Sequence, residues 1–123
     1  MAVPRCVLLV TNHPDTAELY AFALERAGFT VNTAANAGEA IRACHDAPPD
    51  ATVVHFAPAE NPGEVGKALR QANVKMILIG LFSMQLPMTT LQQILEIFDD
   101  VILIPCPPDA LVNRVRRLLE KKK

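Results

Sequence analysis

The chain has 123 residues, of which 50% are hydrophobic and 20% are charged, a composition that fits one globular domain rather than a disordered segment. Its 12 Lys and Arg residues nearly balance 13 Asp and Glu residues, giving a formal net charge of -1. That balance gives no electrostatic reason to expect nucleic acid or an anionic membrane as the main partner.

Strands and helices alternate along the whole chain. Continuous apolar runs such as "CVLLV" are typical of strands that are buried on both faces, and strands are predicted over 6–10, 29–34, 51–56, 75–81 and 101–104. Helices are predicted over 15–27, 36–47, 64–71 and 87–98, and from Pro108 onward. Asn36, followed by Glu39, matches the capping pattern that starts a helix.

The predicted helices carry apolar residues at helical spacing. In the first helix these residues are Leu19, Phe22, Ala23 and Ala27. In the fourth they form one inward stripe of Leu91, Ile94, Leu95 and Phe98, and in the last a stripe of Leu111, Val112, Val115, Leu118 and Leu119. Each helix is therefore expected to pack one face on a sheet.

Residues 76–95 contain no charged side chain, which raises the question of a membrane span. Several polar residues and Pro87 interrupt this stretch, so a buried strand followed by an amphipathic helix explains it better. The chain also begins with too short an apolar run for a signal peptide. Cys6, Cys44 and Cys106 show no paired spacing and are expected to be free thiols, which favours a reducing, cytoplasmic location.

Five strands that alternate with helices predict a single α/β domain, spanning residues 1–123, with a doubly wound parallel sheet of order 2-1-3-4-5. In that order, the loops that follow strands 1, 3, 4 and 5 meet at the carboxyl edge of the sheet. His55 ends the third strand, in "VVHFAP", and therefore lies where such folds keep their chemistry.

The long stretches "CVLLVTNHPDTAELYAFALERAGFTVNTAANAGEAI" and "FDDVILIPCPPDALVNRVRRLL" resemble the receiver domain of response regulators, the CheY-like family of two-component signalling and phosphorelays. Residues 57–98 are more divergent. The resemblance implies a flavodoxin-like, three-layer α/β/α fold, a role in signal transduction and a phosphorylation site at the carboxyl edge of the sheet.

The residues that align with that phosphorylation site are all changed. The two acidic residues that hold Mg²⁺ in the family align with Thr11 and Asn12, and the phosphoacceptor aspartate aligns with His55. The Ser or Thr that bonds the phosphoryl group aligns with Gly80, and the conserved lysine of the family aligns with Ile104. The resemblance also aligns the switch aromatic with Val101 and implies a cis peptide bond before Pro105.

These changes remove the chemistry of the family. Mg²⁺ prefers carboxylate oxygens, and Thr11, Asn12 and His55 supply none. An acyl phosphate also needs an aspartate, so we expect a domain that takes no phosphate, binds no cofactor and is not an enzyme. His55 would then fill the emptied pocket and hydrogen-bond Asn12, Thr11 or a backbone group.

Two other roles for His55 are open. Catalysis would need an orienting carboxylate, which the aligned neighbours lack. A metal- or small-ligand-sensing site could instead use His13, His55 and Cys106, since imidazole and thiolate suit zinc or copper.

A surplus of apolar residues around the fourth helix indicates an interaction surface. Met84, Met88 and Ile97 lie outside its inward stripe, and methionines suit adaptable binding. In the family, helix 4, strand 5 (here with Val101) and helix 5 form the usual output and dimer face. The expected partners are therefore signalling proteins, a fused effector or a second copy, and neither nucleic acid nor membrane.

Overall fold

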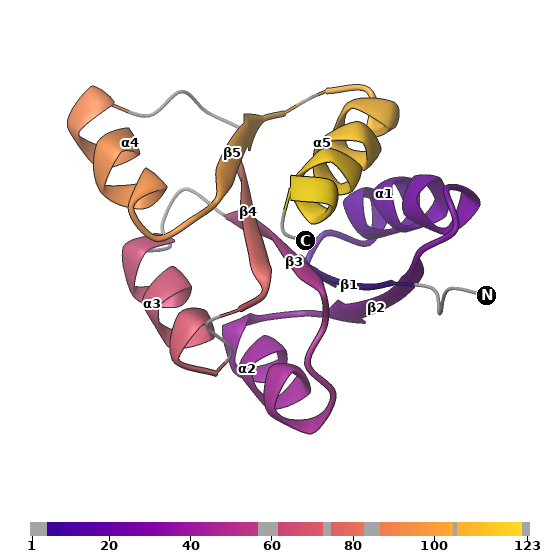
Figure 1. Ribbon diagram of the computed structural model, residues 1–123, viewed down its shortest axis with the longest axis horizontal. Coiled ribbons are helices and arrows are strands. Elements are labelled where there is room, and N and C mark those ends of the chain that lie inside the picture. The colour runs from indigo at the N-terminus through magenta and orange to yellow at the C-terminus, as the bar shows by residue number, and fades with distance from the viewer. Residues whose placement is uncertain (1–4, 57–61, 73–74, 83–86, 105, 122–123) are drawn as a thin grey trace.

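The computed structural model describes residues 5–56, 62–72, 75–82, 87–104 and 106–121, which form a parallel sheet covered by helices on both faces (Figure 1). The strands are β1 (Cys6–Val10), β2 (Thr30–Ala34), β3 (Ala51–Phe56), β4 (Ile77–Phe82) and β5 (Asp100–Leu103). The helices are α1 (Pro14–Arg26), α2 (Ala37–Asp46), α3 (Pro62–Ala72), α4 (Met88–Leu95) and α5 (Pro108–Lys121). The strand order is β2-β1-β3-β4-β5, as predicted.

The sheet separates two apolar clusters, because successive side chains of a strand point to opposite faces. Val7 and Leu9 of β1 join Val53 of β3 in the cluster beneath α1 and α5. Leu8 and Val10 join Val54 in the cluster beneath α2, α3 and α4. The continuous apolar runs of the sequence therefore reflect burial on both faces of the strands.

The observed helices differ from the predicted ones in which residues they bury. In α1, Tyr20 and Leu24 are buried, whereas Leu19 and Phe22 are 50% and 60% exposed. Both sets of residues fit a helical period, but the Tyr20 hydroxyl can donate a hydrogen bond to the backbone oxygen of Cys106, 3.3 Å away. That hydrogen bond satisfies the polar end of Tyr20 and so permits its burial.

The inward stripe predicted for the fourth helix is right for Ile94 and Phe98 and wrong for Leu95. Ile94 and Phe98 are 2% exposed, and Leu95 is 47% exposed. The helix α4 ends at Leu95, earlier than predicted, so the helical period does not extend to Phe98. Phe98 is instead held in the turn before β5, where its N–H donates to the Ile94 oxygen at 2.8 Å.

Other local predictions are confirmed. Asn36 is the N-cap of α2, and its Oδ1 accepts from the Glu39 N–H at 2.9 Å. The α5 stripe packs inward, with Leu118 partly buried. The uncharged stretch 76–95 contains β4 and α4 rather than one helix, and no helix among the described residues is long and apolar enough to cross a membrane.

Two ion pairs fix the helices against the start of β5. Arg70 of α3 donates to the Asp99 carboxylate at 2.7 Å and to the Ile97 oxygen at 2.9 Å, while Asp99 also accepts from the Leu78 N–H at 2.8 Å. On the other face, Arg114 of α5 pairs with Asp100. These contacts hold β5 in register at the edge of the sheet.

Candidate functional site

The carboxyl ends of β1 and β3 bring Thr11 and His55 together. Val10 pairs with Val54 in the parallel register, so the next residues along the two strands are neighbours. Thr11 continues the β1–β2 ladder, because its N–H donates to the Ala34 oxygen at 2.9 Å. Thr11 is 8% exposed, so its hydroxyl group needs partners within the fold.

The Thr11 hydroxyl has two such partners. Its Oγ1 lies 3.0 Å from Nδ1 of His55 and accepts from the His13 N–H at 3.1 Å. If the ring hydrogen of His55 lies on Nε2, Thr11 donates to Nδ1 while accepting from His13. The Thr11 side chain is thus one of the hydrogen-bond partners that the sequence predicted for His55.

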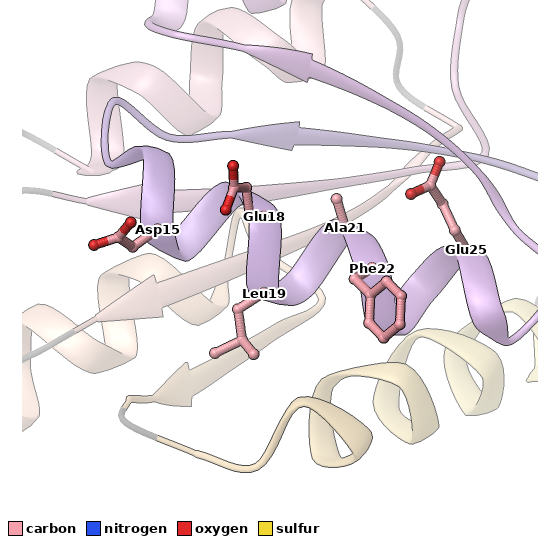
Figure 2. Close-up of a pocket in the computed structure, with 6 residues that line it drawn as sticks. All are labelled: Asp15, Glu18, Leu19, Ala21, Phe22 and Glu25. Carbon is pink, nitrogen blue, oxygen red and sulfur yellow. The ribbon is translucent and has the colours of Figure 1, made fainter.

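The His13 ring also contacts the His55 ring. Its ring centroid lies 5.1 Å from that of His55, with the planes tilted by 48°. Asn12, between Thr11 and His13 in the chain, is exposed. Asp15, the nearest acidic residue in the chain, lies in the first turn of α1 and lines a depression on the outside of that helix (Figure 2).

Cys106 belongs to a different contact. Its Sγ lies 3.7 Å from the Tyr20 hydroxyl, and its backbone oxygen accepts from the same hydroxyl. The pKa of Tyr20 is raised to about 12, mainly by burial and to a smaller extent by the hydrogen bond with the Cys106 side chain. The contact ties α1 to the segment that follows β5.

The described residues contain no group of three or more His, Cys, Asp or Glu side chains arranged to hold a metal ion. The structure brings His13 and His55 together and places Cys106 against Tyr20. Two imidazoles fall short of the four ligands of a structural zinc site or the three protein ligands of a catalytic one.

Gly80 lies inside β4, opposite Val54 and Val101, whereas Leu81 is the β4 residue opposite His55. A Cβ at Gly80 would lie 2.9 Å from the Phe82 ring and 3.4 Å from the Phe56 ring. The two aromatic rings, stacked with centroids 5.0 Å apart, therefore occupy the space that a side chain at Gly80 would need.

Ile104 is a core residue. It is 9% exposed, belongs to the cluster under α1 and α5, and its N–H donates to the Phe82 oxygen at 2.7 Å. The position that the family resemblance gives to a lysine is thus filled by a buried hydrocarbon. Pro105, the next residue, lies outside the described residues.

The residues predicted to form an interface differ from one another in exposure. Met88 is 68% exposed, while Ile97 and Val101 are partly buried and pack against the cluster under α3 and α4. Met84 lies outside the described residues. Sequence reasoning missed Leu103, which is 54% exposed at the end of β5, and the only available signal was that β5 is an edge strand.

No family model matches the chain, and no curated protein matches it in sequence. Solved structures do match it. A CheY-like response regulator receiver domain protein from Methanospirillum hungatei JF-1 matches with a TM-score of 0.88 and 18% identity, over 98% of this chain and 97% of that one. The chain has the CheY-like receiver fold.

Other receiver structures agree. The receiver domain of Francisella response regulator 1452 matches with a TM-score of 0.84 and 22% identity, over 97% of this chain and 99% of that one. A response regulator from Thermotoga maritima matches with a TM-score of 0.86 and 22% identity, over 96% and 99% of the two chains. The predicted fold class is therefore confirmed, and the receiver fold covers nearly the whole chain.

Proposed function

We propose that this chain is an atypical receiver-type signalling domain that works without phosphorylation and acts as a protein-interaction module in the cytoplasm. The receiver fold supports the signalling role. The three free cysteines support a reducing compartment. The hydrogen bond between Thr11 and His55 carries the proposal that phosphorylation is lost.

That hydrogen bond joins a hydroxyl to an imidazole at the edge where the fold would hold Mg²⁺. A hard cation binds carboxylate oxygens, whereas Thr11 and His55 satisfy one another without a cation. A phosphoryl group would also need an aspartate nucleophile and a nearby positive charge. His55 replaces the first, and the buried Ile104 supports the loss of the second.

The absence of phosphate chemistry can be tested by titrating Mg²⁺ into the protein in a calorimeter. We expect no binding heat from the wild type. A variant with Thr11→Asp, Asn12→Asp and His55→Asp introduces three carboxylates and is expected to bind Mg²⁺. The control is a titration of the same variant with a sodium salt, which is expected to give no binding heat. Stoichiometric Mg²⁺ binding by the wild type, with protection of β1 and β3 amides, would contradict the proposal.

The interaction surface that we propose centres on α4 and β5. Met88 and Leu103 are more than half exposed there, and Leu95 is nearly so. Exposed apolar side chains of this kind mark binding surfaces when they gather in one place. The expected occupants are a signalling protein or a fused effector.

A charged substitution tests this surface. Met88→Asp is expected to abolish capture of the partner from the source cell, because it places a carboxylate in an apolar contact. Gln93→Asp is the matched control, since it adds the same charge on α4 about 140° around the helix. Equal capture by wild type and Met88→Asp would place the partner elsewhere.

A further inference from the structure

The outward face of α1 carries four residues in one line, which we call the outer seam: Asp15, Leu19, Phe22 and Arg26. Their spacing of four, three and four residues keeps them on one side of a helix. Tyr20 and Leu24 occupy the buried side. Figure 2 shows Leu19 and Phe22 pointing away from the helix on the same side.

Hollows flank this seam on both sides. One, of about 820 Å³, is lined by the seam residues Asp15, Leu19 and Phe22 together with Glu18 and Glu25. The other, of about 640 Å³, lies between α1 and α5 and is lined by Leu19, Phe22, Arg26 and Arg116 among others. The two apolar side chains therefore form a ridge with room on either side for the side chains of another helix.

Charged side chains line both hollows. Asp15, Glu18 and Glu25 line the first hollow, whereas Arg26 and Arg116 line the second together with Asp109. The Arg26 guanidinium carbon lies 5.7 Å from the centroid of the Phe22 ring, in a cation–π contact. Arg116 donates to the Ala27 oxygen at 3.4 Å. The outer seam itself begins with the negative charge of Asp15 and ends with the positive charge of Arg26.

We propose that the outer seam of α1 binds the same seam of a second copy of this chain, antiparallel, about a two-fold axis between Leu19 and Phe22. In that arrangement, Leu19 packs on Phe22 of the second copy, and Phe22 packs on its Leu19. Asp15 then meets Arg26 of the second copy at each end. One register thus satisfies the apolar and the charged residues together, as an isologous interface requires.

The self-complementary order of the seam fits a second copy, and its charges select the antiparallel orientation. A parallel pair would place Asp15 against Asp15 and Arg26 against Arg26, which costs binding energy. The interface is small, because the twelve residues of helix from Asp15 to Arg26 span only about 17 Å. We therefore expect a weak dimer, with a dissociation constant in the micromolar range or above, as for contacts smaller than about 1,200 Å². The inference does not rest on the loss of phosphorylation.

Sedimentation equilibrium over a range of concentrations tests the proposal. The wild type is expected to self-associate. Asp15→Arg and Arg26→Asp alone are each expected to weaken self-association by about tenfold or more, because each places like charges at both ends of the pair. An equimolar mixture of the two variants is expected to associate like the wild type, since every charged contact is then between opposite signs.

Phe22→Asp and Met88→Asp separate this seam from the surface on α4. Phe22→Asp is expected to give a monomer, and Met88→Asp is expected to leave the dimer unchanged. All four altered side chains are exposed, and thermal unfolding of each variant checks that the fold is kept. A wild type that stays monomeric would overturn the proposal, even if Phe22→Asp blocks binding of another protein. So would a dimer broken by Met88→Asp alone, or two charge variants that fail to associate when mixed.

Discussion

Thr11 shows how one side chain can close a site that a cation would otherwise hold together. Its hydroxyl accepts from the His13 N–H and lies within hydrogen-bond distance of His55. Neighbouring carboxylates at this position would repel one another without a bound cation. Neutral groups that bond to one another avoid that repulsion.

Thr11→Val removes both hydrogen bonds and keeps the shape of the side chain. We expect the free energy of unfolding to fall by about 1–3 kcal/mol, because the His13 N–H and the His55 ring lose a partner. Urea denaturation measures this change. Thr33→Val, at an exposed position of β2, is the control and should change stability by less than about 0.5 kcal/mol. Equal effects would show that the Thr11 contacts carry no special weight.

Tyr20 gives a second prediction at the residue scale, because it is the single tyrosine of the chain. Its pKa is raised from 10.0 to about 12, so the folded state keeps the phenol proton at a pH where the unfolded state loses it. The stability that this shift contributes is complete below pH 10 and is lost as the pH rises through about 12. Ultraviolet absorbance of tyrosinate reports the titration directly.

The variant Tyr20→Phe isolates this effect. The wild type is expected to lose unfolding free energy as the pH rises from 10.0 to about 12, because Tyr20 titrates differently in the folded and unfolded states. The variant has no phenol at this position and is expected not to show that loss. At neutral pH it loses one hydrogen bond to Cys106, at a cost of about 0.5–1.5 kcal/mol. A tyrosinate midpoint near the ordinary value in the folded protein would contradict the buried contact.

At the scale of the elements, the packing of β4 requires a glycine at position 80. The Phe82 ring occupies the space beside Gly80, and Phe56 stacks on it. Gly80→Ala is expected to cost about 1–3 kcal/mol of unfolding free energy, because the ring must move within a packed cluster. In a Phe82→Leu background the same substitution should cost less. Urea denaturation of the four proteins in this cycle gives the coupling, and a coupling of zero would contradict the steric account.

The helices show why part of the structure could not be predicted from the sequence. The capping pair Asn36 and Glu39 is a local signal and was predicted correctly. In α1, two apolar sets share the helical period, and only the tertiary contact between Tyr20 and Cys106 decides which set is buried. Periodicity therefore predicted the helix but not its buried face, and the exposed seam of Leu19 and Phe22 emerged only from the fold.

At the scale of the whole molecule, the strand order followed from alternation and the handedness of crossovers. That order places His55 beside Thr11, so the centre of the candidate site was predictable. The positions of Gly80 and Cys106 relative to that site could not be predicted. They depend on the register of β4 and on the burial of Tyr20, which are set by packing between distant segments. The Thr11–His55 contact joins β1 to β3 at the carboxyl edge of the sheet, and exposed apolar side chains lie on α1, α4 and β5.

We propose that this receiver fold does not respond to phosphoryl chemistry. The most direct measurement is the amide NMR spectrum of the wild type with and without beryllofluoride and Mg²⁺, a mimic of the phosphorylated state. We predict unchanged signals for the residues at the carboxyl ends of β1, β3, β4 and β5. Saturable shifts centred on the amide signals of Thr11 and His55 would contradict the proposed loss of phosphorylation.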